Sequence, residues 1–203
     1  MGGPQSVQDL GRGVLVREEE ELDQGLWENN ICSINVNGLL AKGLNKKNEV
    51  EITVKEENID VLLLQATKLS KDVDSSETFI EGFVEIRQVR EGRGGGGVST
   101  YLRNGRGIIG SQGFSNGWME VLTVTTKETL YVNIYRSPGI KTNQFKEGLD
   151  FLYGELEGKN VYLIVAGDFN LKRLGMWSPI EMSEMRTKIM KNKGEADSSG
   201  LSQ

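Results

Sequence analysis

Two pairs of short polar side chains stand at the ends of apolar segments, with a spacing that suits phosphate chemistry. Asn35 and Asn37 end one such segment, and Asp168 and Asn170 follow the apolar run 161–166. Residues two apart on a strand point to the same face of a sheet, so each pair presents its polar groups together. Amide and carboxylate oxygens of this kind hold hard cations. The same residue types are also frequent turn formers at strand ends, and the spacing alone leaves that alternative open.

Short apolar runs are the elements that must position these pairs. Residues 31–37 are rich in β-formers. Residues 59–64 and 161–166 are continuous apolar runs, typical of strands buried on both faces. Further segments have strand character, the last two as a hairpin: 83–89, 98–102, 119–125 and 130–135. The glycines at 94–97 predict a turn, and they do not form a P-loop because no Gly-Lys-Ser/Thr follows them.

Two segments favour a helix. The charged segment 44–57 has a helical composition, which the β-branched residues at 52–54 weaken. Thr142 or Asn143 is the expected cap of a second helix that ends near residue 156. Its apolar residues recur at helical spacing and predict one core-facing stripe: Phe145, Leu149, Leu152 and Leu156. Strand hairpins mixed with a few helices predict an α/β (α+β) two-sheet sandwich rather than a doubly wound sheet.

The composition restricts the kind of site and the compartment. The chain has 203 residues, 26% charged and 37% hydrophobic, as expected for one globular domain. It has no histidine and a single cysteine, Cys32, which disfavours zinc and excludes an internal disulfide. Any bound metal is expected to be magnesium or manganese. Without a secretory signal or an apolar run of about 18 residues, we expect an intracellular protein, nuclear or cytoplasmic, that is neither secreted nor membrane-bound.

The charge is distributed unevenly. The net charge is −5, and the acidic run Glu18 to Glu21 belongs to a leader, 1–29, that we expect to be disordered. Residues 87–106 contain five arginines and one glutamate, a net charge of +4. This segment predicts either a local basic surface or a solvated loop. Arg103 and Arg106 are its candidate phosphate or DNA contacts.

Five short motifs follow one another along the chain. They are SINVNGL at 33–39, DVLLLQATKL at 60–69, GGGV at 95–98, VNIY at 132–135 and GDFN at 167–170. In this order they resemble the endonuclease/exonuclease/phosphatase family, which includes abasic-site endonucleases and the endonuclease domains of non-LTR retrotransposons. The stretch after Asn170, with Trp177, is similar to the retrotransposon branch. The resemblance covers roughly residues 30–180.

The resemblance implies a two-sheet α/β sandwich that hydrolyses phosphodiesters with magnesium or manganese. It implies that Asn37 and Asp168 hold the metal, with Asn35 behind them, and that Asn35 and Asn170 contact the phosphate. Tyr135 matches the tyrosine that hydrogen-bonds the scissile phosphate. Asp168 matches the aspartate that orients or deprotonates the attacking water. Asn170 matches the asparagine that stabilises the transition state. Tyr135, Asp168 and Asn170 are therefore the implied catalytic residues.

Three departures from the family pattern count against the reaction, and the first of them predicts weak or absent metal binding. The family's second motif has a glutamate, its principal metal ligand, where this chain has Ala66, and a methyl group cannot coordinate a cation. Glu57 and Asp60 lie toward the other end of that strand and are poor substitutes. The family's closing Ser-Asp-His motif has no counterpart in a chain without histidine. The chain ends 33 residues after Asn170, too few for the strands that complete the family's second sheet.

We therefore expect a degenerate, C-terminally truncated, retrotransposon-type endonuclease domain that is catalytically impaired or inactive. The expected organisation is a leader at 1–29, a partial domain at 30–180 and a polar tail at 181–203, with a short helix at 181–193. One alternative is an endonuclease with residual DNA-nicking activity, and another is a module that binds nucleic acid or a protein. A small-molecule substrate is disfavoured. Salt-dependent binding would indicate DNA, and salt-insensitive binding a protein partner.

Overall fold

The computed structural model describes residues 29–41, 46–91, 94–159 and 161–170. The expected leader before residue 29, the polar tail with its short helix, and Trp177 lie outside these ranges. The predictions about those segments therefore remain predictions.

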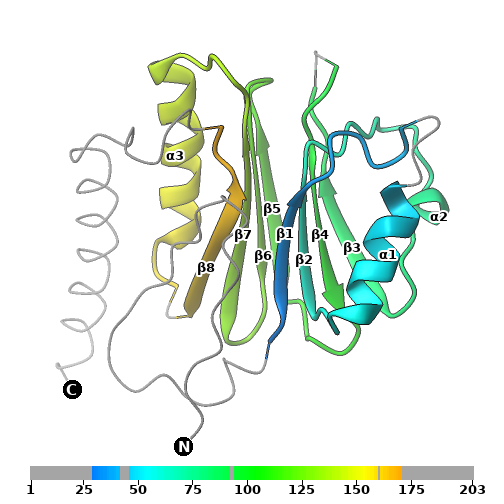
Figure 1. Cartoon of the computed structure of the whole chain (residues 1–203). Coiled ribbons are helices and arrows are strands. Elements are labelled where there is room, and N and C mark those ends of the chain that lie inside the picture. The colour runs from blue at the N-terminus through cyan, green and yellow to red at the C-terminus, as the bar shows by residue number, and fades with distance from the viewer. Residues whose placement is uncertain (1–28, 42–45, 92–93, 160, 171–203) are drawn as a thin grey trace, which may run out of the picture.

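Two four-stranded sheets pack face to face, with α1 and α3 on opposite outer faces (Figure 1). The strand order is β1-β2-β4-β3 in the first sheet and β5-β6-β7-β8 in the second. The strands are β1 (Ile31–Asn35), β2 (Val61–Gln65), β3 (Phe83–Gln88), β4 (Val98–Arg103), β5 (Gly110–Ser115), β6 (Met119–Thr125), β7 (Thr129–Arg136) and β8 (Tyr162–Asp168). The helices are α1 (Lys46–Glu56), α2 (Ser75–Thr78) and α3 (Thr142–Leu156). This architecture confirms the predicted α/β two-sheet sandwich.

The first sheet is built around β2, whose residues are all buried. β2 pairs in parallel with β1 and antiparallel with β4. On the outer face, Leu62 and Leu64 pack with Val50 and Val54 of α1 in one buried cluster. Val50 and Val54 are four residues apart and so share one face of the helix. The helix predicted at 44–57 therefore forms, with narrower bounds, because this burial outweighs the low helix propensity of β-branched residues.

The second sheet contains the predicted hairpin and one strand that the sequence does not predict. β6 and β7 pair antiparallel as expected, and β7 pairs in parallel with β8. The pattern gives no signal for β5 because its sequence, GSQGFS, has two glycines and little apolar character. β8 is a strand as predicted, but only Ala166 and Gly167 in it are buried. Its edge position among the described strands of the sheet explains this lower burial.

Helix α3 covers the outer face of the second sheet with the predicted apolar stripe. Its cap differs from the prediction, because Thr142 already has helical backbone geometry and Lys141 is the N-cap residue. The Gln144 side-chain oxygen accepts a hydrogen bond from the Lys141 backbone N–H at 3.2 Å. No helix among the described residues has the length and apolar character that crossing a membrane requires.

A polar bridge crosses the apolar layer between the two sheets. Gln65 Nε2 donates to Asn133 Oδ1 at 2.8 Å, and Asn133 Nδ2 donates to the backbone carbonyl of Ser99 at 3.0 Å. Both amide side chains are fully buried. Figure 1 shows β1 and β8 running toward the same end of the sandwich. The bridge lies near that end, because Gln65 pairs with Asn35 and Asn133 lies two residues before Tyr135.

Candidate active site

The polar residues of the second sheet form a row across three neighbouring strands at the end where β8 stops. Glu120 of β6 is paired with Tyr135 of β7, and Tyr135 is paired with Asp168 of β8. Strand pairing therefore brings together three polar side chains that are far apart in the sequence. Tyr135 also packs against the apolar layer between the sheets, so its side chain lies on the inner side of the sandwich.

Asp168 joins this row to the first sheet. The Asn35 side-chain amide donates a hydrogen bond to Asp168 Oδ2. Asp168 Oδ1 accepts from the backbone N–H of Asn170 at 2.9 Å. Asn35 Oδ1 accepts from the backbone N–H of Asn37 at 2.9 Å, and the Asn170 amide donates to the carbonyl of Arg136 at 2.6 Å. The fold thus places Asn35, Asn37, Asp168 and Asn170 in one hydrogen-bonded cluster beside Tyr135.

Asn37 and Asn170 occupy unusual backbone positions in this cluster. Both have left-handed backbone angles, with φ of 48° and 44°. Asparagine tolerates this region better than most residues because its short amide can hydrogen-bond locally. The asparagine pairs therefore act both as turn formers and as polar groups of the cluster, so the two alternatives from the sequence are not exclusive.

The other two predicted contacts, Arg103 and Arg106, lie at the opposite end of the first sheet. Arg103 Nε and Arg106 Nη2 bind Asp60 Oδ1 at 2.9 and 3.0 Å. Asp60 precedes β2, whereas Asn35 is paired with the last residue of β2. The length of β2 therefore separates Arg103 and Arg106 from the cluster. Any DNA contact that they made would be distinct from a contact at the cluster. Their role in DNA binding remains a prediction.

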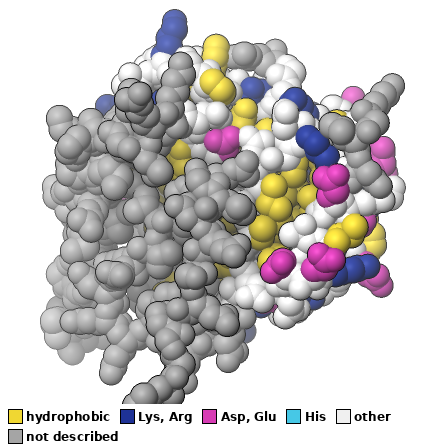
Figure 2. All heavy atoms as spheres, viewed as in Figure 1, with side chains coloured by type: hydrophobic (Ala, Val, Ile, Leu, Met, Phe, Trp, Pro, Cys, Tyr) yellow, Lys and Arg dark blue, Asp and Glu magenta, His cyan; other side chains and the backbone are white. Residues whose placement is uncertain are grey.

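The arginine-rich segment 87–106 does not form one basic surface within its described residues. Arg87 donates to the Val73 carbonyl at 2.6 Å, and Arg90 is buried in an ion pair with Glu120 at 2.7 Å. Figure 2 shows basic and acidic side chains interspersed on the part of the face that is not grey. The sequence-based hypothesis of a single basic surface was wrong because tertiary contacts send these arginines to different sites.

Burial is the main influence on the pKa of the Tyr135 phenol. Burial raises the pKa of Tyr135 above its ordinary value of 10.0, and the charges of Asp168 and Glu120 add to the increase. Arg90 acts in the opposite direction. The phenol is therefore neutral at neutral pH and is a hydrogen-bond donor suited to a phosphate oxygen.

Several basic groups surround the cluster that the sequence did not single out as site residues. Lys46 Nζ donates to the Val36 carbonyl at 2.6 Å and to the Asn37 carbonyl at 3.3 Å. Arg136 Nη1 donates to the Phe169 carbonyl at 3.2 Å. The exposed Lys68 follows β2, and its side chain would touch a Cβ at Gly38, the residue after Asn37. Of these groups, only Lys68 belongs to one of the five sequence motifs, the one at 60–69. Together they favour an anionic ligand.

Ala66 lies at the edge of the cluster, directly after the residue paired with Asn35. It is 3% exposed and has a left-handed φ of 52°. That geometry costs a non-glycine residue about 1–2 kcal/mol. It is held here by a hydrogen bond of 2.7 Å from the Gly38 N–H to the Ala66 carbonyl. The position therefore has a defined conformation but contributes only a methyl group.

The donors present do not fit a dedicated magnesium site. Magnesium prefers near-octahedral oxygen ligands and is usually held by one or two carboxylates together with water and phosphate oxygens. Asp168 contributes one carboxylate, and both of its oxygens already accept hydrogen bonds. Glu120, the neighbouring carboxylate, is occupied by Arg90. The residues that the structure describes contain no group of three or more His, Cys, Asp or Glu side chains able to hold a metal.

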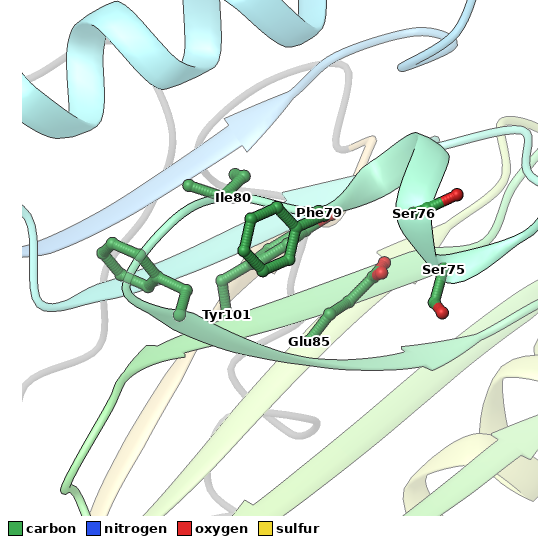
Figure 3. A pocket seen from close by; sticks show the side chains of 7 residues that line it. Ser75, Ser76, Phe79, Ile80, Glu85 and Tyr101 are labelled. Carbon is green, nitrogen blue, oxygen red and sulfur yellow. The ribbon is translucent and has the colours of Figure 1, made fainter.

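A separate hollow of about 350 Å³ lies beside α2, on the outer face of the first sheet (Figure 3). Phe79, Glu85 and Tyr101 are among its lining residues. Glu85 accepts from Ser99 Oγ at 2.9 Å, and the Tyr101 hydroxyl donates to the Thr78 carbonyl at 3.0 Å. Burial, with a contribution from Glu85, raises the pKa of Tyr101 and keeps the phenol neutral. No predicted site residue lines this hollow, so it is distinct from the candidate site.

Solved structures share this fold at low sequence identity. The 3′ phosphatase NExo from Neisseria, bound to a product DNA hairpin, is 16% identical with a TM-score of 0.56, covering 80% of this chain and 70% of that chain. The AP endonuclease from Archaeoglobus fulgidus is 19% identical with a TM-score of 0.53, covering 82% and 70%. D. rerio TDP2 complexed with a single-strand DNA product is 18% identical with a TM-score of 0.52, covering 71% and 62%. At these identities the likeness establishes the fold alone.

Sequence comparison gives the family. A search of curated proteins found no match. The family model described as the endonuclease/exonuclease/phosphatase family matches residues 32–180. This match spans more than half of the 203 residues and contains β2 through β8 and all of β1 except Ile31. The chain therefore belongs to the endonuclease/exonuclease/phosphatase family.

Proposed function

We propose that this chain is a degenerate, retrotransposon-type endonuclease domain that binds DNA but hydrolyses it poorly or not at all. The observation that carries the proposal is Ala66, which places a methyl group at the edge of the Asn35–Asp168 cluster. The resemblance implies that family members have a metal-binding glutamate there. Among the described residues of the cluster, Asp168 alone supplies a carboxylate, and one carboxylate is a weak anchor for the metal that would offset the charge of a phosphodiester.

The remaining groups suit recognition of a phosphate. Tyr135 presents a neutral phenol, and the amide nitrogens of Asn35 and Asn170 each carry a second hydrogen beyond the one already donated. Lys46 and Lys68 add positive charge at the same end of the sandwich. Two proteins of the same fold were solved with a DNA product. DNA is therefore the partner we propose for this end of the molecule.

Residual nicking is the competing hypothesis, and the environment of Asp168 favours it. Asp168 still accepts hydrogen bonds from Asn35 and from the Asn170 backbone, which would orient a carboxylate that positions or deprotonates water. Against this, removing one well-placed electrostatic group typically costs about 10²–10³ in rate. Loss of the metal-binding glutamate that the resemblance implies at Ala66 should therefore leave little activity.

Salt dependence of binding tests the proposed partner. The affinity of the full chain for a fluorescently labelled duplex is measured by anisotropy between about 50 and 200 mM salt. The logarithm of the affinity should fall linearly with the logarithm of the salt concentration. Replacing Lys68 by alanine should reduce that slope by about 1. Lys55→Ala is the matched control, because Lys55 is an exposed lysine in the last turn of α1.

Two results would contradict the proposal. Salt-insensitive capture of the duplex would show that phosphate contacts do not dominate, and a protein partner would become the better hypothesis. Equal reductions of the slope in Lys68→Ala and Lys55→Ala would place the contact elsewhere on the surface.

A further inference from the structure

Arg90 is a buried charged residue beside the candidate site, and acidic and hydroxyl groups fix its orientation. Its Nε and Nη2 atoms donate to the two carboxylate oxygens of Glu120 at 2.7 and 2.9 Å. Nη2 also donates to Ser137 Oγ at 2.6 Å. The side chains of Arg90 and Glu120 are 5% and 0% exposed. A bidentate carboxylate holds a guanidinium in one plane, so these contacts determine how Arg90 meets its other neighbours.

Tyr135 is one of those neighbours. The Cζ atom of Arg90 lies over the Tyr135 ring, 5.4 Å from its centroid. A guanidinium in this position is attracted to the negative face of the ring. Glu120 is the strand partner of Tyr135, so the ion pair is anchored beside the ring that it supports. Arg90 therefore lies against one face of the Tyr135 ring.

The glycine turn admits this guanidinium. A Cβ on Gly96 would overlap the Cζ, Nε and Nη2 atoms of Arg90. Gly97 approaches from the same turn, and its backbone N–H donates to Glu120 Oε2 at 3.4 Å. The Gly96 carbonyl accepts from the Lys68 N–H at 2.7 Å, which links the turn to the loop that carries Ala66. Two glycines of the run that forms no P-loop, Gly96 and Gly97, thus have a structural role at the site.

We propose that Arg90 is a positioning residue, which fixes the Tyr135 phenol in the direction of the Asp168 cluster and which the turn at 94–97 is shaped to accommodate. The proposal rests on the proposed function only for the claim that Tyr135 contacts a phosphate. The placement of the ring by Arg90 is a separate claim about this chain. A purely stabilising ion pair would affect unfolding without acting on DNA binding through the Tyr135 hydroxyl.

Two glycine variants form a matched test of the placement. Gly95 and Gly96 both have left-handed backbone, with φ of 83° and 73°, so alanine strains both. A Cβ at Gly95 meets nothing within 4 Å, whereas a Cβ at Gly96 displaces Arg90. The full chain, isotope-labelled on its tyrosine rings, is examined by NMR, and Tyr135→Phe identifies the Tyr135 signal. We expect Gly96→Ala to shift that signal, because the guanidinium of Arg90 moves away from the Tyr135 ring.

Gly95→Ala is the control for the placement of the Tyr135 ring by Arg90. Gly95→Ala should leave the Tyr135 signal unchanged. A wild-type signal in Gly96→Ala would show that the ring does not depend on Arg90. Equal shifts in both glycine variants would show that the turn, rather than Arg90, determines the environment of Tyr135. Either outcome refutes the proposal, and neither requires DNA.

A double-mutant cycle on DNA affinity tests whether Arg90 acts through Tyr135. Tyr135→Phe should weaken binding roughly 2- to 10-fold, the loss of about one hydrogen bond. Arg90→Lys should weaken it by a similar factor in the wild-type chain but not further in Tyr135→Phe. Arg87→Lys is the matched control, an arginine of β3 that donates to the Val73 carbonyl. Independent, multiplicative losses would overturn the positioning role.

The two proposals fail in different ways. If the wild-type chain does not bind the duplex, the proposed function fails, and the NMR comparison of Gly95→Ala with Gly96→Ala still decides the placement of Tyr135. If the chain binds DNA with the expected salt dependence but the cycle is additive, the proposed function stands and the role of Arg90 is refuted.

Discussion

Replacing Asn133 by leucine tests how far the polar bridge between the sheets stabilises the fold that positions the site. Asn133 accepts from Gln65 at 2.8 Å and donates to the carbonyls of Ser99 and Leu64 at 3.0 and 3.2 Å. Leucine has the same branching at Cγ as asparagine, so the main cost comes from buried polar partners that lose a hydrogen bond. Each such group costs about 1–3 kcal/mol. Because Gln65 keeps its bond to the Leu63 carbonyl at 2.9 Å, we expect a total loss of about 2–4 kcal/mol.

The assay is urea unfolding of the full chain, followed by circular dichroism and by fluorescence to check that the transition is two-state. A parallel thermal melt should show a Tm lower by about 4–16 °C, because 1 kcal/mol changes the Tm of a protein of this length by about 2–4 °C. Asn143→Leu, at an exposed position near the start of α3, is the matched control and should change stability by no more than about 0.5 kcal/mol. A loss in Asn133→Leu no larger than in this control would refute the reasoning.

Two further predictions concern metal binding and acid stability. Ala66→Glu should strengthen magnesium binding in calorimetry relative to Ala66→Gln, and equal affinities would count against the alignment of Ala66 with the family's glutamate. Burial raises the pKa of Asp60, but hydrogen bonds from the Asn30 backbone, Arg103 and Arg106 outweigh it and lower the pKa below 3.8. The stabilisation from Asp60 is therefore complete above that value and is lost as the pH falls through the lowered pKa. Asp60→Asn should destabilise the chain at neutral pH and lose less stability on acidification, and parallel pH profiles of urea midpoints would contradict this.

Much of the fold could be predicted because its elements have strong local patterns. β2, the β6–β7 hairpin and the stripe of α3 combine apolar periodicity with clear boundaries, and all of them form as predicted. β5 could not be predicted, since GSQGFS has no such pattern and is a strand through its pairing with β6. The cap of α3 was misplaced by one residue because Lys141 has no side chain typical of a cap.

The sequence indicated the residues of the Asn35–Asp168 cluster, but it did not indicate the Arg90–Glu120 ion pair beside them. The strand-end motifs identified Asn35, Tyr135, Asp168 and Asn170, and strand pairing brings them to one end of the sandwich. The Arg90 contact could not be found, because its partner Glu120 lies 30 residues away and both are ordinary residue types in a charged chain. The glycine run 94–97, a few residues after Arg90, was the available sequence signal for this contact. Arginines that cluster in the sequence give no information about the sites to which folding takes them.

Nicking of supercoiled plasmid by the full chain, in magnesium and in manganese, tests the central claim most directly. Asp168→Ala is the control, because it removes the carboxylate that would orient or activate water. The account predicts folded protein that binds the plasmid and leaves it supercoiled, with no difference between wild type and Asp168→Ala. Nicking by the wild-type chain that disappears in Asp168→Ala would contradict it, and would show that other groups replace the glutamate missing at Ala66.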